Sequence, residues 1–248
     1  MTDLTEIRRA VILAAGIGAR LAHHTEHAPK PLLNVAGRPL IEHTLIALKD
    51  SGIQEVVVVA GYRGDALEEA LKPMRGVSLC VVHNTQFGRG ASFSLAAARA
   101  SMGQDPFLLV MSDHLLSSQL LTRLMKSEPR DACRVAADSG RWPTAYVEEA
   151  TLLQTTEDGH VLRIGKGISP FSALDAGAFA CTREIWTALD EAPLDCDIST
   201  VFSRLVARGR LFAADVSGCP WFDIDTPEDI PLAEAMLAEA RTAAVVAS

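Results

Sequence analysis

The chain has 248 residues, of which 48% are hydrophobic and 22% are charged, and its formal net charge at pH 7 is −8. This acidic balance argues against a protein that binds nucleic acid or another polyanion. No run of about 18 apolar residues occurs, so no membrane span is predicted. The first residues contain no apolar signal core, and we expect a cytoplasmic protein. The five cysteines are odd in number and widely spaced, which indicates reduced side chains rather than a zinc site.

Short apolar strands alternate with helices in the first half of the chain. The pattern predicts strands at 10–14, 55–60, 77–82 and 107–111, and helices from Pro39 to Ser51, at 65–71 and at 92–101. A β-α-β-α-β-α-β order predicts a parallel sheet with right-handed crossovers.

The pattern changes after about residue 130. Further strands are predicted at 132–137, 145–147, 151–156, 161–164, 174–180 and 211–216, with helices at 182–189, at 198–208 and from Thr226 to about 240. The closely spaced strands around residues 157–160 predict antiparallel pairing. We therefore expect an α/β fold, with a Rossmann-like, mostly parallel sheet, helices on both faces and a small antiparallel region in the C-terminal half. Residues 1–248 are expected to form one domain with two sub-regions.

A glycine-containing loop follows the first predicted strand. Gly16 and Gly18 allow backbone N–H groups to approach a phosphate chain closely, while Arg20 and Lys30 supply positive charge. The prolines on either side of Lys30 restrict its backbone. A dinucleotide-binding fingerprint would require a third glycine where Leu21 stands, and no P-loop pattern occurs. The loop is therefore a candidate phosphate site, with an ordinary turn as the alternative.

Three aspartates and one lysine are candidates for the rest of a site. Asp113 follows the strand at 107–111, at the sheet edge where α/β proteins bind ligands, and Mg²⁺ favours one or two carboxylates together with phosphate oxygens. Asp223 and Asp225 would share a face of a strand. We favour Asp223 as the second metal ligand, with Asp225 either a ligand or a helix cap. Lys166, between two glycines, is a candidate anion-binding residue, or simply a lysine in a turn.

These motifs together resemble the sugar-1-phosphate nucleotidyltransferase superfamily. The matching segments are Leu13–Leu21 (LAAGIGARL), Pro29–Leu32 (PKPL), Asp113 after the fourth strand, Lys166 ahead of Asp175–Phe179 (DAGAF), and Trp221–Asp229 (WFDIDTPED). Within the superfamily, the segments at 111–115, 164–167 and 222–225 are most similar to CTP:inositol-1-phosphate cytidylyltransferases.

The resemblance implies that CMP passes from CTP to inositol 1-phosphate, giving CDP-inositol and pyrophosphate. It implies that Arg20 meets the β- and γ-phosphates, Lys30 the α-phosphate and Lys166 the acceptor phosphate, with Mg²⁺ on the aspartates. The residues implied around CTP are Leu13, Ala14, Ala15, Gly16, Gly18, Asn84, Gly90 and Ser92. Residues 1–130 would then be the nucleotide-binding half, and residues 131–248 the acceptor-binding half.

The sequence also departs from the superfamily pattern. Gly90–Ser92 replaces the usual Asn-Gly, and Asp175–Gly177 replaces Asp-Thr-Gly. Phosphocholine, 2-aminoethylphosphonate and hexose 1-phosphates therefore stay open as acceptors. A CTP-sensing module without activity is the main non-enzyme alternative, and Leu21 argues against an NAD-dependent oxidoreductase. We expect a stand-alone transferase without the membrane-embedded phosphotransferase partner of such enzymes, and a homodimer is compatible with the sequence.

Overall fold

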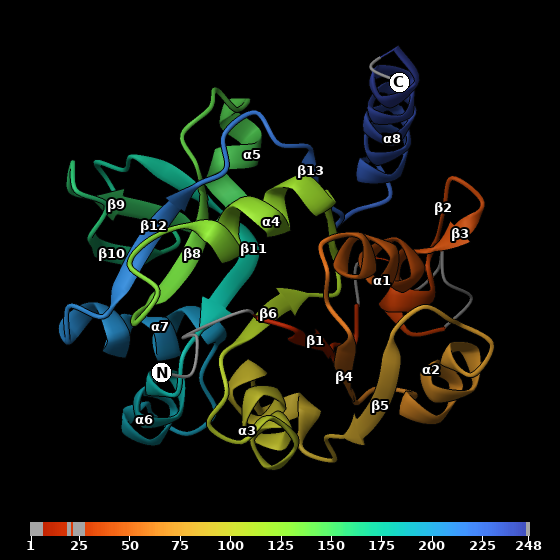
Figure 1. The fold of residues 1–248 in the computed structure, drawn as a ribbon, viewed down its shortest axis with the longest axis horizontal. Helices are drawn as coiled ribbons and strands as arrows, with labels where there is room; N and C mark the ends of the chain where they lie inside the picture. Colours follow the sequence, from red (N-terminus) through yellow and green to blue (C-terminus); the bar gives the residue numbers. More distant parts are fainter. Residues whose placement is uncertain (1–6, 19–20, 22–27, 247–248) are drawn as a thin grey trace.

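A nine-stranded mixed sheet runs through the centre of the molecule, as seen in the computed structural model, which describes residues 7–18, 21 and 28–246 (Figure 1). Its strands are β1 (Arg9–Ala14), β4 (Glu55–Ala60), β5 (Ser78–His83), β6 (Phe107–Met111), β8 (Cys133–Asp138), β9 (Leu152–Thr155), β10 (Val161–Gly165), β11 (Ala173–Cys181) and β12 (Leu211–Asp215). The order β10-β9-β11-β6-β1-β4-β5 forms the main path, and β8 pairs with both β11 and β12.

The direction of pairing changes at β11. Strands β6, β1, β4 and β5 are parallel to one another, whereas β11 is antiparallel to β6, β8 and β9, and β9 is antiparallel to β10. This arrangement confirms the predicted parallel sheet with an antiparallel region in the C-terminal half. In the parallel part, the carboxyl ends of β1 and β6 lie side by side, with Leu13 opposite Met111.

Helices cover both faces of the sheet, as predicted. They are α1 (Leu40–Asp50), α2 (Gly64–Leu71), α3 (Ala91–Met102), α4 (Ser118–Lys126), α5 (Thr144–Glu149), α6 (Glu184–Glu191), α7 (Ile198–Ala207) and α8 (Asp229–Val246). None of the helices in the described part of the chain is both long and apolar enough to cross a membrane.

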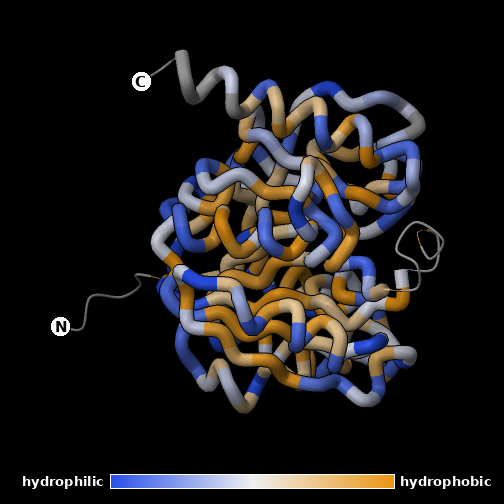
Figure 2. The backbone as a smooth tube through the Cα atoms, turned by 90° about the vertical axis from the view of Figure 1, so that its right-hand side faces the viewer, coloured by the Kyte–Doolittle hydropathy of each residue, from blue (hydrophilic) through white to orange (hydrophobic). Residues whose placement is uncertain are grey.

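The alternation of side chains along β1 explains the two layers. Ala10, Ile12 and Ala14 belong to a hydrophobic cluster with buried residues of α1, α2 and α4. Val11 and Leu13 point the other way, into a cluster with α3, α6 and α7. Because helices cover both faces of the sheet, the sequences of its strands are continuous apolar runs. Figure 2 shows these hydrophobic strands in the interior of the molecule.

A small ribbon holds the segments that follow β6 and precede α8. It consists of β7 (His114–Leu116) and β13 (Trp221–Asp223), which pair antiparallel so that Asp223 lies opposite His114. Leu115 and Ile224 are buried in a third cluster with Val35 of the short strand β2 (Asn34–Val35) and Ala233 of α8. The short elements η2 (Lys30–Leu32) and β3 (Arg38–Pro39) lie on either side of β2 in the chain. The last short helix, η3, spans Phe87–Arg89.

Two local expectations are wrong, and one helix was not predicted. Residues 145–147 are not a strand but part of α5, which begins directly after Pro143 and turns the Tyr146 ring against Trp142 and Phe222. Helix α4 was not predicted, although Ser117 caps it by accepting a hydrogen bond from the Leu120 amide. The last helix begins at 229 rather than 226, and it continues to 246 rather than ending near 240.

Helix α1 offers a matched test of the packing. Leu48 is fully buried in the first cluster, whereas Ile46 is 38% exposed on the same helix. We expect Leu48→Ala to lower the free energy of unfolding by about 2–5 kcal/mol, because it removes buried contacts and leaves a cavity. Ile46→Ala should cost under about 1 kcal/mol. Urea denaturation of the two variants measures the difference, and equal losses would contradict the assigned face of α1.

Candidate active site

A cavity of about 310 Å³ lies at the carboxyl ends of β1 and β6. The predicted residues Leu13, Ala15, Gly16, Gly18, Lys30, Gly90, Asp113 and Asp225 all line it. Gly18 has a φ of +62°, and a Cβ there would lie 2.7 Å from the Cβ of Lys30. The second glycine of the loop is therefore needed both for its conformation and for the close approach of the lysine.

Lys30 is buried between two carboxylates. Its Nζ donates hydrogen bonds to Oδ2 of Asp113 at 3.1 Å and to Oδ1 of Asp225 at 2.8 Å. Burial alone would lower the pKa of this ammonium group, but the charges of Asp113 and Asp225 outweigh it, and the pKa is raised. Lys30 therefore keeps its charge at neutral pH while it lines the cavity.

His114 connects Asp113 to the ribbon. Its Nδ1 donates to Oδ1 of Asp113 at 2.9 Å, and its ring stacks on Trp221 with centroids 6.1 Å apart and planes at 5°. Burial opposes the charged ring, but the charge of Asp223 and the bond to Asp113 raise the pKa of His114 to about 9. For Asp113, burial opposes ionisation, but Lys30 and His114 together hold its pKa well below the usual value.

Asp223 is the carboxylate near Lys30 and His114 that has a buried oxygen without a hydrogen bond among the described residues. Its Oδ1 is buried 3.7 Å from the Nδ1 of His114 and accepts no hydrogen bond within the described part of the chain. Burial raises its pKa to about 6, although the charge of His114 works in the opposite direction. The backbone N–H of Ile224 donates to the carbonyl oxygen of Asp113 at 3.0 Å, which fixes the two carboxylates beside each other.

Asp229, the first residue of α8, holds the segment that leads into the helix. Oδ2 of Asp229 accepts hydrogen bonds from the amides of Asp225 at 2.9 Å and Thr226 at 2.6 Å, and from the Thr226 hydroxyl at 3.0 Å. The Asp225 carboxylate is thereby left to bind Lys30.

The donor set fits a hard divalent cation. Asp113, His114 and Asp223 each offer a ligand atom within 4.8 Å of the others, and Asp225 is not part of this triplet. A pair of carboxylates, one with a buried oxygen that lacks a hydrogen bond, matches the preference of Mg²⁺ for oxygen ligands.

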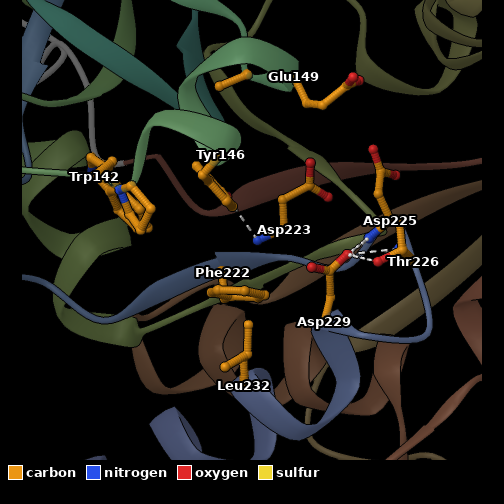
Figure 3. A pocket seen from close by; sticks show the side chains of 11 residues that line it. Trp142, Tyr146, Glu149, Phe222, Asp223, Asp225, Thr226, Asp229 and Leu232 are labelled. Carbon is orange, nitrogen blue, oxygen red and sulfur yellow. Dashed lines mark hydrogen bonds between the residues drawn. The ribbon is translucent and has the colours of Figure 1, made fainter.

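A second cavity, of about 380 Å³, shares Asp225 with the first (Figure 3). Its walls are the rings of Trp142, Tyr146 and Phe222, the carboxylates of Glu149, Asp223, Asp225 and Asp229, and Pro143, Ala150, Thr226 and Leu232. Lys166 lies beside this cavity and not in the Lys30 cluster, because its exposed Nζ is 3.9 Å from Oε2 of Glu149.

The segment expected to contact the base, residues 84–94, is held by hydrogen bonds among its own residues. Asn84 does not line the cavity; its amide group donates to Oγ of Ser94 at 3.0 Å, and its Oδ1 accepts from the amide of Gln86. Ser94, which was not predicted, lines the cavity instead. The buried Oγ of Ser92 has no hydrogen-bond partner among the described residues.

The amino end of α3 is packed against a segment from the C-terminal half. The Ser92 amide donates to the carbonyl oxygen of Cys196 at 3.1 Å, and Arg89 forms an ion pair with Asp195 at 2.8 Å. Gly90 has a φ of +120°, and a Cβ there would lie 2.6 Å from that same carbonyl oxygen. The glycine is therefore required for this contact.

Among the described residues, Ala14, Asn84, Ser92 and Lys166 line neither cavity. Ala14 is fully buried within β1, and Arg20 lies outside the described residues. Sequence reasoning missed His114 and the aromatic walls of the second cavity. The position of His114 directly after Asp113 was the available signal for the histidine, whereas the walls come from segments about 80 residues apart, 142–146 and 222.

Asp175 provides a test of these electrostatics. Burial raises its pKa to about 7, against the hydrogen bond from the Gly177 amide at 2.8 Å. Such a group binds its proton more tightly in the folded state, so stability is lost as the pH rises from the unfolded pKa towards the folded one. We expect the free energy of unfolding of the metal-free protein to fall between about pH 4 and 7, and to fall less in Asp175→Asn.

Urea denaturation at several pH values makes this comparison. Because Asp223 titrates in the same pH range, the fall in the free energy of unfolding should be smaller in Asp175→Asn but still present. Asp105→Asn is the control, because this side chain is 76% exposed. An unchanged pH dependence in Asp175→Asn would contradict the assignment.

Comparison with known proteins confirms the resemblance drawn from the motifs. The chain is 36% identical over 232 residues to the "Bifunctional IPC transferase and DIPP synthase" of Rubrobacter xylanophilus, a match that covers 92% of this chain and 51% of the relative. It is 32% identical to the "CMP-5'-(3-aminopropyl)phosphonate synthase" of Streptomyces rubellomurinus, covering 89% and 37%. The chain thus spans about half or less of the length of these curated relatives.

Comparison with solved structures agrees with the sequence comparison. The inositol-1-phosphate CTP transferase from T. maritima superposes with a TM-score of 0.83 at 25% identity, covering 94% of this chain and 96% of that one. The family description "MobA-like NTP transferase domain" matches residues 10–181, which include β1, the glycine loop and Asp113. The chain therefore belongs to the family of MobA-like nucleotidyltransferases.

Proposed function

We propose that the chain transfers CMP from CTP to inositol 1-phosphate, giving CDP-inositol and pyrophosphate. The observation that carries this proposal is the position of Lys30, whose partner Asp225 lines both cavities. A cation in one cavity, bound to the carboxylate that both cavities share, suits a reaction in which two anionic substrates must meet. The names of the T. maritima structure and the Rubrobacter relative support inositol phosphate as the acceptor.

In this proposal the first cavity holds the nucleotide. The backbone around Gly16 and Gly18 would follow the triphosphate, and Lys30 would stabilise the charge that develops at the α-phosphate. Arg20, outside the described residues, is proposed to meet the β- and γ-phosphates. The segment around Gly90, supported by Asn84 and Ser94, would face the cytosine.

The second cavity is proposed to hold the acceptor. Lys166 would attract the acceptor phosphate from the rim of this cavity. An oxygen of that phosphate then forms a bond to the α-phosphorus of CTP, and the bond to pyrophosphate breaks. No covalent enzyme intermediate is needed, because an ionised phosphate is already a nucleophile. Catalysis would consist of positioning and charge neutralisation.

Asp113 and Asp223 are proposed to hold Mg²⁺, with Asp225 kept on Lys30. The buried, unbonded Oδ1 of Asp223 is the feature that supports this choice over Asp225. Bound there, Mg²⁺ would neutralise charge on the phosphate oxygens. His114 would orient Asp113 through its hydrogen bond to Oδ1.

Pyrophosphate release from CTP tests the proposed reaction. With Mg²⁺ present, we expect acceptor-dependent release with inositol 1-phosphate, and this should exceed release with glucose 1-phosphate. Omission of the acceptor is the control for simple hydrolysis. Binding of CTP without release for any acceptor would instead support a CTP-sensing module, and release with glucose 1-phosphate alone would identify a hexose-1-phosphate enzyme.

Replacement of the central lysine tests its role. We expect Lys30→Met to lower kcat by about 100-fold or more, because the α-phosphate loses its charged partner. Lys72→Met is the matched control, since Lys72 is 64% exposed just after α2 and forms a surface ion pair with Glu69. Circular dichroism establishes that both variants are folded. Turnover within a few-fold of the unmodified protein would show that Lys30 is structural only.

A further inference from the structure

Tyr146 brings a hydroxyl group to the second cavity, next to Asp223. The residue belongs to α5, and its ring lines the cavity and packs on Trp142 at a centroid distance of 4.8 Å and on Phe222 at 5.8 Å. Its hydroxyl oxygen accepts a hydrogen bond from the backbone N–H of Asp223 at 3.3 Å, as Figure 3 shows. The ring packing and this bond together fix the position of the hydroxyl.

The proton of this hydroxyl has no acceptor in the part of the chain that the structure describes. The bond from the Asp223 amide uses the hydroxyl oxygen as an acceptor, and no described carbonyl or carboxylate accepts the O–H. A tyrosine hydroxyl both donates and accepts, and it keeps its proton at neutral pH. Tyr146 therefore has one hydrogen-bond donor left for a bound molecule.

An anion in this cavity depends on such donors. Four carboxylates line the cavity, and among the described residues no lysine, arginine or histidine does. Phosphate oxygens that lose water need new donors, because unpaired polar groups are costly to bury. The Thr226 hydroxyl is already bound to Asp229 at 3.0 Å. A cation at position 146 would pair with the carboxylate of Asp223, whereas the neutral tyrosine stays available.

The hydroxyl lies where the two cavities adjoin. The segments of Asp223 and Asp113 are joined by the hydrogen bond from the Ile224 amide to the Asp113 carbonyl oxygen at 3.0 Å, and Asp113 lines the first cavity. A phosphate beside Asp223 is therefore close to the place proposed for the nucleotide. We propose that Tyr146 is a substrate-binding residue whose hydroxyl donates a hydrogen bond to the phosphate of the acceptor.

This inference rests on the proposed function and adds a residue to it. Tyr146 holds one oxygen of the acceptor phosphate. Another oxygen of that phosphate bonds to the α-phosphorus of CTP, and pyrophosphate leaves with the electron pair of the broken bond. Because the contact is made before the transfer as well as during it, its loss raises KM for the acceptor and leaves kcat unchanged.

Tyr146→Phe removes the hydroxyl and keeps the ring. At saturating CTP and Mg²⁺, we expect KM for inositol 1-phosphate to rise by about tenfold or more, as loss of a hydrogen bond to a charged group implies. The values of kcat and of KM for CTP should change by less than about twofold. An acceptor KM within about twofold of that of the unmodified protein would overturn the proposal.

Tyr62→Phe is the matched control. Tyr62 is the other tyrosine of the chain, and its ring meets Phe87 edge-on, with centroids 6.4 Å apart. Its hydroxyl plays no part in the proposed contact, so the acceptor KM should stay at the value of the unmodified protein. An equal rise in both tyrosine variants would show a general effect of the substitution and would overturn the role of Tyr146.

Two further readouts distinguish a substrate contact from a structural role. Tyr146 also holds the Asp223 backbone, and a role through Asp223 would raise the Mg²⁺ concentration needed for half-maximal rate. We expect this concentration to be unchanged in Tyr146→Phe, and a rise in it without a rise in acceptor KM would overturn the proposal. Trp142→Phe removes the indole donor of the lining. A higher acceptor KM in that variant alone would assign the contact to Trp142 instead.

Calorimetry separates this inference from the proposed reaction. Inositol 1-phosphate is titrated into the protein with Mg²⁺ and α,β-methylene CTP, which cannot release pyrophosphate. Weaker binding to Tyr146→Phe, in a protein that releases no pyrophosphate from CTP, would overturn the reaction and support the contact. Equal binding to the variant and the unmodified protein would overturn the contact, whatever the outcome for pyrophosphate release. Absence of binding to either protein would overturn both.

Discussion

The buried ammonium group of Lys30 connects segments that are far apart in the chain. Its partners Asp113 and Asp225 lie 83 and 195 residues away, at the end of β6 and just before α8. A buried charge is tolerated only when it is paired and hydrogen-bonded, so each of these segments must be in place for the others to be stable. The contact that joins these segments at this edge of the sheet therefore also fixes a positive charge in the first cavity, on the carboxylate that it shares with the second.

Most of this arrangement could be predicted from the sequence, because its causes are local. Runs such as Glu55–Ala60 have the β-branched composition of strands buried on both faces, and glycine or proline marks where the strands end. Once the strands are parallel, their carboxyl ends meet at one edge. Lys30, Asp113 and the pair around Ile224 were accordingly expected together, and the structure brings them together.

The parts that escaped prediction depend on contacts between distant segments. The apolar residues at 145–147 are too few to distinguish a strand from a helix, and the rings of Trp142 and Phe222 decide the outcome. The Asp225 carboxylate binds Lys30, a contact across 195 residues that a local sequence pattern does not contain. The unusual pKa of Asp175 comes from its burial in the folded protein.

The contact between Gly90 and the carbonyl oxygen of Cys196 ties the amino end of α3 to residues 195–197. Any side chain at position 90 would displace that backbone. Related enzymes that carry a larger residue there must therefore run the other segment along a different path. In the proposed arrangement, in which Gly90 faces the cytosine, base preference and the course of the 195–197 segment would change together in evolution. A chimaera that exchanges one loop without the other would carry a mismatched pair.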